Sequence, residues 1–345
     1  MIRGMSLRVI DANLNRAREG LRTAEEYARL VLDDAPSAQT IKDARRLVQT
    51  CADAFGPELL AARDIEHDVG TRPKADDVTR GSEREIALAG LKRAQEALRV
   101  IEEFSQLHSP TAAAAAAKAR YAAYAAEQQL FINAPRRALL RESPVMAIFS
   151  GACAREDRRD VLKSLLDAGC RLFQLREKER TAAEFRRFAA AFIEHANGHE
   201  ALTVINDRAD IAAAAGAQGV HLGQQDLPPE DARRLLGPGA LIGVSTHNPE
   251  EAREAEQIGA DYVGLGAMFH TETKKVQSVA GPKAVSQVQA GVQIPVFCIG
   301  GITPANVGEL VGHGARHIAV SSALLNAPDP GAEYKALCKA LGEHA

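Results

Sequence analysis

The sequence has few cysteines, and their arrangement marks neither a metal site nor a disulfide framework. There are five in 345 residues, an odd number, and they are widely scattered. None has the Cys-x-x-Cys spacing of a zinc site, and disulfide-rich proteins are small and dense in cysteine. Because free cysteine is among the most buried residue types, we expect reduced packing residues at Cys51, Cys153, Cys170, Cys298 and Cys338.

A long apolar run is also missing. No segment approaches the roughly 18 apolar residues that read as a membrane-spanning helix. In the first twenty residues, charged side chains such as Arg3, Arg8 and Asp11 interrupt the apolar core that a signal peptide would need. We therefore expect a cytoplasmic protein with no membrane partner.

There is no excess of basic charge. Lys and Arg number 42 against 45 Asp and Glu, which gives a net charge of -3. Proteins that bind nucleic acid usually carry a clustered basic surface. We expect no nucleic-acid partner and favour small molecules.

The composition is that of an ordinary folded protein. Hydrophobic residues make up 46% and charged residues 25% of the chain, which excludes a disordered or fibrous protein. A single domain usually has about 100 to 200 residues. The length of 345 residues therefore predicts two domains.

The N-terminal part has a helical pattern. From about residue 10 to 131, apolar residues recur at intervals of three and four, and alternating β-branched runs are missing. The alanine-rich stretch 112–126 is predicted as a closing helix, because alanine is the best helix former. Residues 12–30 align without gaps on 89–107 with ten of nineteen positions identical, which indicates an internal duplication.

The duplicated segment repeats charged residues as well as apolar ones. On a helix at 100° per residue, the apolar residues share one face and the charged residues the other. We interpret the charged face as solvent-exposed and joined by ion pairs three and four residues apart, with a functional role of the repeated charges as the alternative. The apolar face holds Leu14, Ala17, Leu21, Ala24 and Ala28, and the charged face holds Arg16, Glu19, Arg22 and Glu26.

After Pro144 the pattern changes to short β-rich runs that alternate with helical segments. We count eight such units, which predicts a (β/α)₈ TIM barrel preceded by an all-α helical domain, with a doubly wound sheet as the alternative. The domain boundaries are 1–135 for the helical domain, 136–144 for a linker and 145–345 for the barrel. The predicted strands are 145–149, 171–176, 201–206, 219–222, 241–245, 262–266, 295–299 and 317–321.

Charged residues follow five of these strands, at the end of a barrel where active sites lie. They occur in the segments 174–178, 206–207, 221–226, 245–247 and 271–275. Carboxylates can hold a magnesium ion, and Arg and Lys can neutralise phosphate oxygens. This combination predicts a site for a magnesium-bound diphosphate.

The last two strands end in small residues, in the segments 298–303 and 320–323. Glycine and serine at this place allow backbone N–H groups to surround a phosphate. Two phosphate sites that face one cavity indicate two phosphorylated substrates or one bisphosphate.

The barrel half resembles the thiamine phosphate synthase family over residues 145–343. The matching motifs are QLREK at 174–178, VIND at 204–207, GVHLGQQD at 219–226, IGVSTH at 242–247, DYVGLG at 261–266, TETKK at 271–275 and IGGIT at 299–303. The resemblance implies a transferase that uses Mg²⁺. It joins a hydroxymethylpyrimidine diphosphate to the ring nitrogen of hydroxyethylthiazole phosphate and releases pyrophosphate without a protein nucleophile.

The resemblance also implies roles for thirteen residues. Those that hold the pyrimidine diphosphate are Gln174, Arg176, Lys178, Asn206, Ser245 and Lys274, of which Arg176, Lys178, Ser245 and Lys274 are the catalytic candidates. Those that bind magnesium are Asp207 and Asp226, and those that hold the thiazole phosphate are Thr271, Thr273, Gly301, Ser321 and Ser322.

Two features qualify the resemblance. The segment 266–270 reads Gly-Ala-Met-Phe-His where the family usually has Gly-Pro and a second proline, so the loop after it is expected to be less rigid. A related branch, the thiazole tautomerases, shares the barrel but generally lacks the full diphosphate set. Since Asp207, Asp226 and Lys274 are all present, we favour the synthase, and we expect His221 to be a structural residue of its strand.

The helical half is similar to a module fused ahead of some thiamine phosphate synthases and described as an alternative hydroxymethylpyrimidine phosphate kinase. The similarity covers residues 7–130 and rests on the segments 10–22, 61–71 and 91–104. It implies ATP as a further partner, although the Gly-x-x-x-x-Gly-Lys-Ser/Thr loop is absent. Acidic candidates are Asp64, Glu66 and Asp68 beside Gly70. A non-catalytic module that joins the chain into a homo-oligomer is the alternative.

Overall fold

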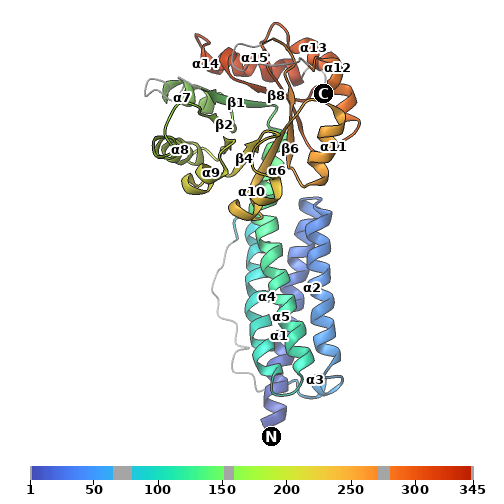
Figure 1. The fold of residues 1–345 in the computed structure, drawn as a ribbon. Helices are drawn as coiled ribbons and strands as arrows, with labels where there is room; N and C mark the ends of the chain where they lie inside the picture. The colour runs from blue at the N-terminus through green and yellow to red at the C-terminus, as the bar shows by residue number, and fades with distance from the viewer. Residues whose placement is uncertain (1, 65–79, 151–158, 271–279, 343–345) are drawn as a thin grey trace. The chain divides into compact units, whose positions relative to one another are not determined.

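The computed structural model describes residues 2–64, 80–150, 159–270 and 280–342 (Figure 1). The chain divides into two compact units, Met1–Pro135 and Arg136–Ala345, which we call the helical unit and the barrel unit. Within the described ranges, no helix is long and apolar enough to cross a membrane.

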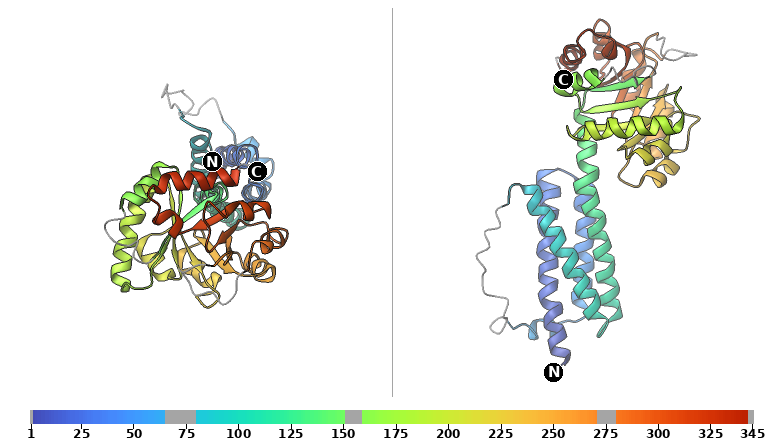
Figure 2. Two further views of the ribbon diagram at one scale, coloured as in Figure 1. Left: turned by 90° about the horizontal axis from the view of Figure 1, so that it is seen from above. Right: turned by 90° about the vertical axis from the view of Figure 1, so that its left-hand side faces the viewer.

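The helical unit contains four long helices that lie side by side (Figure 2). The bounds of the long helices are α1 Ile2–Glu26, α2 Ala35–Asp53, α4 Glu83–Ser105 and α5 Pro110–Gln128, with a short α3 Glu58–Ala61 and π-helical turns η1 Tyr27–Val31 and η2 Gln129–Asn133. Helix α1 packs against α4, and α2 packs against α5. The duplicated segments, which lie mainly in α1 and α4, therefore contact each other.

Three of these helices begin at residues that the local sequence favours for capping. The side chains of Asp34, Ser82 and Ser109 each accept a hydrogen bond from a backbone N–H in the first turn of α2, α4 and α5. Such caps satisfy N–H groups that have no partner within the helix. The alanine-rich segment is therefore an ordinary capped helix, as predicted.

The apolar face predicted for residues 14–28, which lie in α1 and the start of η1, is buried in the helical unit. Leu14, Ala17, Leu21, Ala24 and Ala28 are each at most 1% exposed. The backbones of α1 and α4 approach so closely that a Cβ atom added at Gly20 would lie 2.3 Å from the carbonyl oxygen of Gly90. Small residues at this crossing are therefore a condition for packing the two helices.

The barrel unit contains eight parallel strands that close in sequence order. Every strand agrees with its predicted range to within one residue at each end, so the predicted TIM barrel is confirmed and the doubly wound sheet is wrong. The strands are β1 Val145–Ser150, β2 Leu172–Arg176, β3 Leu202–Asn206, β4 Gly219–Leu222, β5 Leu241–Thr246, β6 Tyr262–Gly266, β7 Val296–Ile299 and β8 His317–Val320.

Helices surround the strands, as the alternating pattern predicts. Between the strands and outer helices lies the larger of the two cores of this unit, built from residues such as Phe149, Phe173 and Phe192, whose rings pack edge to face. The helices are α7 Arg159–Asp167, α8 Ala182–Asn197, α9 Ala209–Ala215, α10 Pro229–Leu236, α11 Pro249–Gln257, α12 Lys283–Gln289, α13 Val307–Gly312, α14 Ser322–Leu325 and α15 Pro330–Gly342.

The segment 136–144, predicted as a linker, is instead mostly helical and belongs to the barrel. Helix α6 spans Ala134–Glu142. Its Leu140 is 1% exposed and packs with residues at the beginnings of strands, among them Met146 and Leu172. The Nε atom of Arg137 donates to Oδ1 of Asp261 at 2.9 Å. The helix therefore covers the end of the barrel opposite to the expected site.

Four of the five cysteines lie in the described residues, and all four are free thiols. Cys51, Cys170 and Cys298 are buried and Cys338 is half-buried. Burial raises the pKa of the Cys51 thiol to about 11 and that of Cys298 to about 12. These groups are protonated packing residues, as predicted, and Cys153 lies outside the described residues.

Candidate active site

The carboxyl ends of the barrel strands surround a cavity of about 630 Å³. This volume lies in the range of roughly 300 to 1,000 Å³ that is usual for small-molecule sites. Ten of the thirteen predicted residues line it: Gln174, Arg176, Lys178, Asn206, Asp207, Asp226, Ser245, Gly301, Ser321 and Ser322. The other three, Thr271, Thr273 and Lys274, lie outside the described residues.

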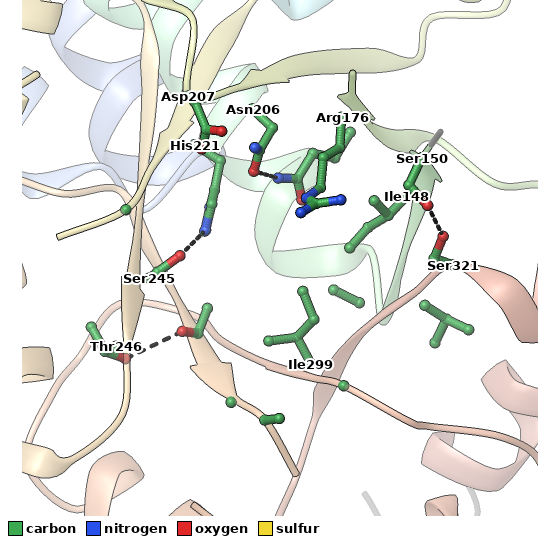
Figure 3. A pocket seen from close by; sticks show the side chains of 18 of the residues that line it. Ile148, Ser150, Arg176, Asn206, Asp207, His221, Ser245, Thr246, Ile299 and Ser321 are labelled. Atoms are coloured by element: carbon green, nitrogen blue, oxygen red, sulfur yellow. Dashed lines mark hydrogen bonds between the residues drawn. The ribbon is translucent and has the colours of Figure 1, made fainter. Parts of the chain in front are cut away.

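Strands β2 and β3 contribute a pair of buried amides to the cavity wall. The side-chain nitrogen of Gln174 donates to Oδ1 of Asn206 at 2.8 Å (Figure 3). The two side chains are 3% and 9% exposed. This bond leaves an amide oxygen of Gln174 and an amide nitrogen of Asn206 for a ligand. An acceptor beside a donor is suited to a flat heterocycle that carries an amino group.

Asp207 follows β3 and is held in an unusual backbone conformation. Its φ of 62° lies in the left-handed region, which Asp tolerates better than most residues. Its backbone N–H donates to the carbonyl of His221 at 2.8 Å, and its carboxylate pairs with the ammonium of Lys178. Burial favours the neutral acid, but Lys178, with smaller contributions from Asp226 and Arg176, lowers the pKa of Asp207 overall.

Asp226 lies in the loop after β4 and interacts with Asp207. Its Oδ2 accepts a hydrogen bond of 2.6 Å from the backbone N–H of Gly223. Burial, followed by the charge of Asp207, raises the pKa of Asp226, although the Gly223 N–H opposes the shift. Two neighbouring carboxyl groups thus have pKa values shifted in opposite directions. Such a pair is what a bound cation would stabilise in its fully ionised form.

The donor set of this pair fits magnesium. Mg²⁺ is commonly held by one or two carboxylates, and water and substrate phosphates complete its octahedron. In the part of the chain that the structure describes, no group of three or more His, Cys, Asp or Glu could hold a metal. Asp207 and Asp226 therefore match a Mg²⁺ that is shared with a phosphate ligand, and do not match a closed zinc site.

His221 in β4, expected to be a structural residue of its strand, lines the cavity. Its Nε2 lies 3.0 Å from Oγ of Ser245, and its Nδ1 lies 3.1 Å from the hydroxyl of Tyr262. The ring is buried, with 6% of its surface exposed. The signal for this position was the alternation of β4, which points His221 into the barrel interior.

Ser150 is a cavity residue that sequence reasoning missed. Its Oγ lies 2.8 Å from Oγ of Ser321 (Figure 3). Strand β1 continues one residue beyond its predicted end at Phe149, so that Ser150 follows Met146 and Ile148 on the inward face. The hydroxyl group of Ser150 at the end of β1 and that of Ser321 just after β8 therefore meet at the expected phosphate site.

The glycines after β7 allow two segments of backbone to lie in contact. Gly300 and Gly301 have φ values of 104° and 66°. A Cβ atom at Gly301 would lie 2.5 Å from the carbonyl oxygen of His270. No other residue fits these conformations without strain. Packing against residue 270 is therefore a reason for the Gly-Gly pair, in addition to the expected phosphate binding.

The segment without the family's usual prolines is tied to β7 by backbone hydrogen bonds. The N–H of Met268 donates to the carbonyl oxygen of Ile299 at 2.9 Å, and the N–H of Phe269 donates to the carbonyl oxygen of Gly300 at 3.0 Å. The carbonyl of Ala267 accepts from the N–H of Ala280 at 2.9 Å. Backbone hydrogen bonds therefore hold residues 267–269 in place although the segment has no proline. The loop 271–274, which was expected to be less rigid, lies outside the described residues.

Ion pairs account for part of the repeated charges in the helical unit. Glu25 pairs with Arg45 across α1 and α2, and Glu102 pairs with Arg120 across α4 and α5. The exposed pairs Arg22–Glu26 and Arg99–Glu103 also repeat, at the predicted spacing of four. The bonds between helices give the repeated glutamates a structural reason that single-helix spacing did not reveal.

The acidic candidates of the helical unit are only partly described. Asp64 is half-exposed and lies 3.5 Å from Arg8. Nearby, Asp11 is 7% exposed and accepts two hydrogen bonds of 2.7 and 2.8 Å from Arg63. Glu66 and Asp68 lie outside the described residues.

Two protein families match the chain, one in each unit. Residues 145–324 match the family described as thiamine monophosphate synthase. Residues 8–129 match the family described as the ThiD2 family. Both resemblances inferred from the motifs are confirmed, and each family match falls within one of the two units of the structure.

Curated relatives share both units. A thiamine-phosphate synthase of Synechocystis sp. is 39% identical over 94% of this chain and 92% of its own length. One of Gloeobacter violaceus is 38% identical over 94% of both chains. Among solved structures, a thiamine phosphate pyrophosphorylase of Pyrococcus furiosus is 32% identical, with a TM-score of 0.53 over 59% of this chain and 98% of its own. This chain belongs to the thiamine-phosphate synthase family.

Proposed function

We propose that the barrel cavity joins hydroxymethylpyrimidine diphosphate to hydroxyethylthiazole phosphate and releases pyrophosphate. The observation that supports this most is that both sets of residues predicted to bind phosphate line one cavity. Asp207, Asp226 and Lys178 lie at the ends of β2, β3 and β4, whereas Gly301 and Ser321 follow β7 and β8. A cavity with both sites can hold a diphosphate and a monophosphate ligand facing each other.

On the pyrimidine side, the amides of Gln174 and Asn206 would bind the ring through its amino group and a neighbouring nitrogen. Arg176, Lys178 and Ser245 would donate hydrogen bonds to the diphosphate, together with Lys274. Negative charge grows on the diphosphate as its bond to the methylene carbon breaks. Donors and cations fixed in a partly closed cavity stabilise that charge most in the transition state.

Asp207 and Asp226 would hold a Mg²⁺ ion that binds the same diphosphate. When bound, the ion supplies positive charge that makes the diphosphate a better leaving group. Lys178, which pairs with Asp207 in the structure, would then share its charge with phosphate oxygens. The charge of the bound ion would keep the carboxylates of Asp207 and Asp226 ionised at neutral pH.

On the thiazole side, Gly301, Ser321 and Ser322 would hold the monophosphate, together with Thr271 and Thr273. The Ser150 hydroxyl supports that of Ser321. The remaining task of the cavity is to place the thiazole nitrogen next to the methylene carbon and to exclude water, which would otherwise trap the cationic pyrimidine.

The test is an assay of the purified full chain with both phosphorylated heterocycles and Mg²⁺. We expect stoichiometric thiamine phosphate and pyrophosphate. Asp226→Asn should lower kcat at least about 100-fold, because a charged ligand to the metal is lost at the transition state. Asp231→Asn is the matched control, since Asp231 forms an exposed pair with Arg234 in α10. Full activity of Asp226→Asn at saturating Mg²⁺ would contradict the assignment, and isomerisation of a thiazole carboxylate phosphate alone would favour a tautomerase.

For the helical unit, we propose phosphorylation of hydroxymethylpyrimidine phosphate with ATP and Mg²⁺. The family match over residues 8–129 supports a kinase-like module, and the product would be the diphosphate that the barrel uses. Asp64 and Asp68 are the first candidates for metal or base roles.

We also propose a cytoplasmic location, because the described cysteines are free thiols and disulfides are rare in the cytosol.

The full chain decides between this kinase and a module that only forms oligomers. Incubation with hydroxymethylpyrimidine phosphate and ATP should yield ADP and the diphosphate, and with the thiazole phosphate present it should yield thiamine phosphate. Two results together would favour the oligomerisation module over the kinase. The full chain would form no ADP at high enzyme concentration, and it would sediment as a homo-oligomer that the truncated barrel does not form.

A further inference from the structure

A chain of three hydrogen-bonded side chains crosses strands β4, β5 and β6. The hydroxyl of Tyr262 contacts Nδ1 of His221 at 3.1 Å, and Nε2 of His221 contacts Oγ of Ser245 at 3.0 Å (Figure 3 shows the second contact). His221 and Ser245 line the cavity, whereas Tyr262 is 1% exposed and lies in the barrel core. These three hydrogen-bonded side chains thus connect the barrel core to the ligand site.

Two glycines make room for these rings. A Cβ atom at Gly243, which is the register partner of Tyr262, would lie 2.1 Å from Cζ of that ring. A Cβ atom at Gly264 would lie 3.0 Å from Cε1 of His221. The strands therefore carry glycine where a larger residue would displace the tyrosine or the histidine.

The buried phenol determines which nitrogen of His221 carries the proton. A neutral imidazole has one donor and one acceptor nitrogen. Burial, with the charge of Asp261, raises the pKa of Tyr262, so its hydroxyl remains protonated. In the described part of the chain, His221 is its hydrogen-bond partner, and a buried O–H without an acceptor is costly. In a neutral ring, Tyr262 therefore donates to Nδ1, and the ring proton lies on Nε2.

This tautomer controls the direction of the Ser245 hydroxyl. With a proton on Nε2, His221 donates to Oγ of Ser245, so the hydroxyl hydrogen of Ser245 is free to point toward the cavity. The opposite tautomer would accept that hydrogen and present only a lone pair to a ligand. A donor is the form that binds an anionic phosphate oxygen.

We propose that Tyr262 and His221 are positioning residues that hold the Ser245 hydroxyl as a hydrogen-bond donor to the diphosphate in the cavity. The inference rests on the proposed function, in which Ser245 contacts the pyrimidine diphosphate. Tyr262 acts on that diphosphate through two hydrogen bonds, without contacting it.

The test is a double-mutant comparison in the full chain. Tyr262→Phe removes only the phenol oxygen, and we take as the scale the roughly 10- to 100-fold that residues behind metal ligands typically contribute. We expect a loss of about this size in kcat and in affinity for inorganic pyrophosphate with Mg²⁺. In a Ser245→Ala background, Tyr262→Phe should change both quantities less than about twofold, because coupled residues are not additive.

Two further variants keep the test decisive. Tyr334→Phe is the matched control, since it removes another buried phenol, whose hydroxyl contacts Gly169 in the same unit, and it should leave both quantities unchanged. If Tyr262→Phe unfolds, His221→Gln should show the same loss and the same lack of additivity with Ser245→Ala.

An undiminished Tyr262→Phe enzyme would overturn the inference, as would an equal loss with and without Ser245. Failure of the proposed function is a separate result. In that case the wild-type chain makes no thiamine phosphate, and the double-mutant comparison still applies to pyrophosphate affinity.

Discussion

At the residue scale, Asp207 and Asp226 have opposite environments within one cavity. Burial opposes ionisation of Asp207, but Lys178, Asp226 and Arg176 together lower its pKa, while burial and the charge of Asp207 raise that of Asp226. The ionised form of Asp226 is therefore unfavourable in the metal-free fold. This stability cost is measurable without any substrate.

Asp226→Asn should raise the Tm of the metal-free protein at pH 7, by roughly 2 °C if about 1 kcal/mol is relieved, while the proposed function predicts that it lowers kcat. A carboxyl with a raised folded pKa destabilises the fold when ionised, so the gain should shrink as the pH falls and wild-type Asp226 becomes protonated. Thermal unfolding in EDTA at pH 7 and pH 4.5 measures the difference.

Asp207→Asn should have the opposite effect. The lowered pKa of Asp207 means that its ionised form stabilises the fold above its unfolded pKa, and this contribution is lost as the pH falls through its folded pKa. We expect a lower Tm at pH 7 and a smaller deficit toward pH 3. Equal shifts of both variants in the same direction would contradict the opposite pKa changes.

At the scale of elements, α6 acts as part of the barrel although its sequence resembles a linker. Prolines at 135 and 144 and several arginines suggest an irregular segment. Only Leu140 is fully buried, in the cluster at the strand beginnings. Arg137 and Arg233 both bind the buried carboxylate of Asp261, which also accepts the Ile242 N–H.

Leu140→Ala should destabilise the barrel by about 2 to 5 kcal/mol, the usual range for a buried leucine. Leu235→Ala is the control, because Leu235 is 51% exposed and should change stability little. Urea unfolding, followed by a spectroscopic signal that reports on the barrel, measures the stability change of both variants. For the same reason, a barrel fragment that begins at residue 134 should be more stable than one that begins at 144.

At the scale of the whole molecule, the two units have separate hydrophobic cores. Residues such as Leu21 and Leu98 belong to the core of the helical unit, and residues such as Leu166 and Val263 to that of the barrel. Domains with their own cores can unfold independently. The stability of the chain is therefore expected to be described by two transitions.

Calorimetry should resolve these two transitions. Leu21→Ala should lower the temperature of one transition, and Leu166→Ala that of the other, since each residue is at most 1% exposed in its own core. A single transition that shifts with both variants would indicate that the units unfold together.

The sequence by itself determined the order of elements, the barrel and most of the cavity residues. Buried strands of a parallel sheet are short apolar runs, and their ends lie on one face of a barrel, so local patterns were sufficient. Gln174, Asn206 and Ser321 could be placed in one site for this reason. Helix α6 was missed because a single buried leucine leaves almost no pattern.

Only the tertiary structure decided how these residues pair. Ser150 meets Ser321 171 positions away, and His221 meets Tyr262 and Ser245 because β4, β5 and β6 are neighbours in a closed sheet. The opposite pKa shifts of Asp207 and Asp226 depend on distances between loops. Hydrogen bonds and charges act over a few ångströms of space, and separation along the chain does not reveal that distance.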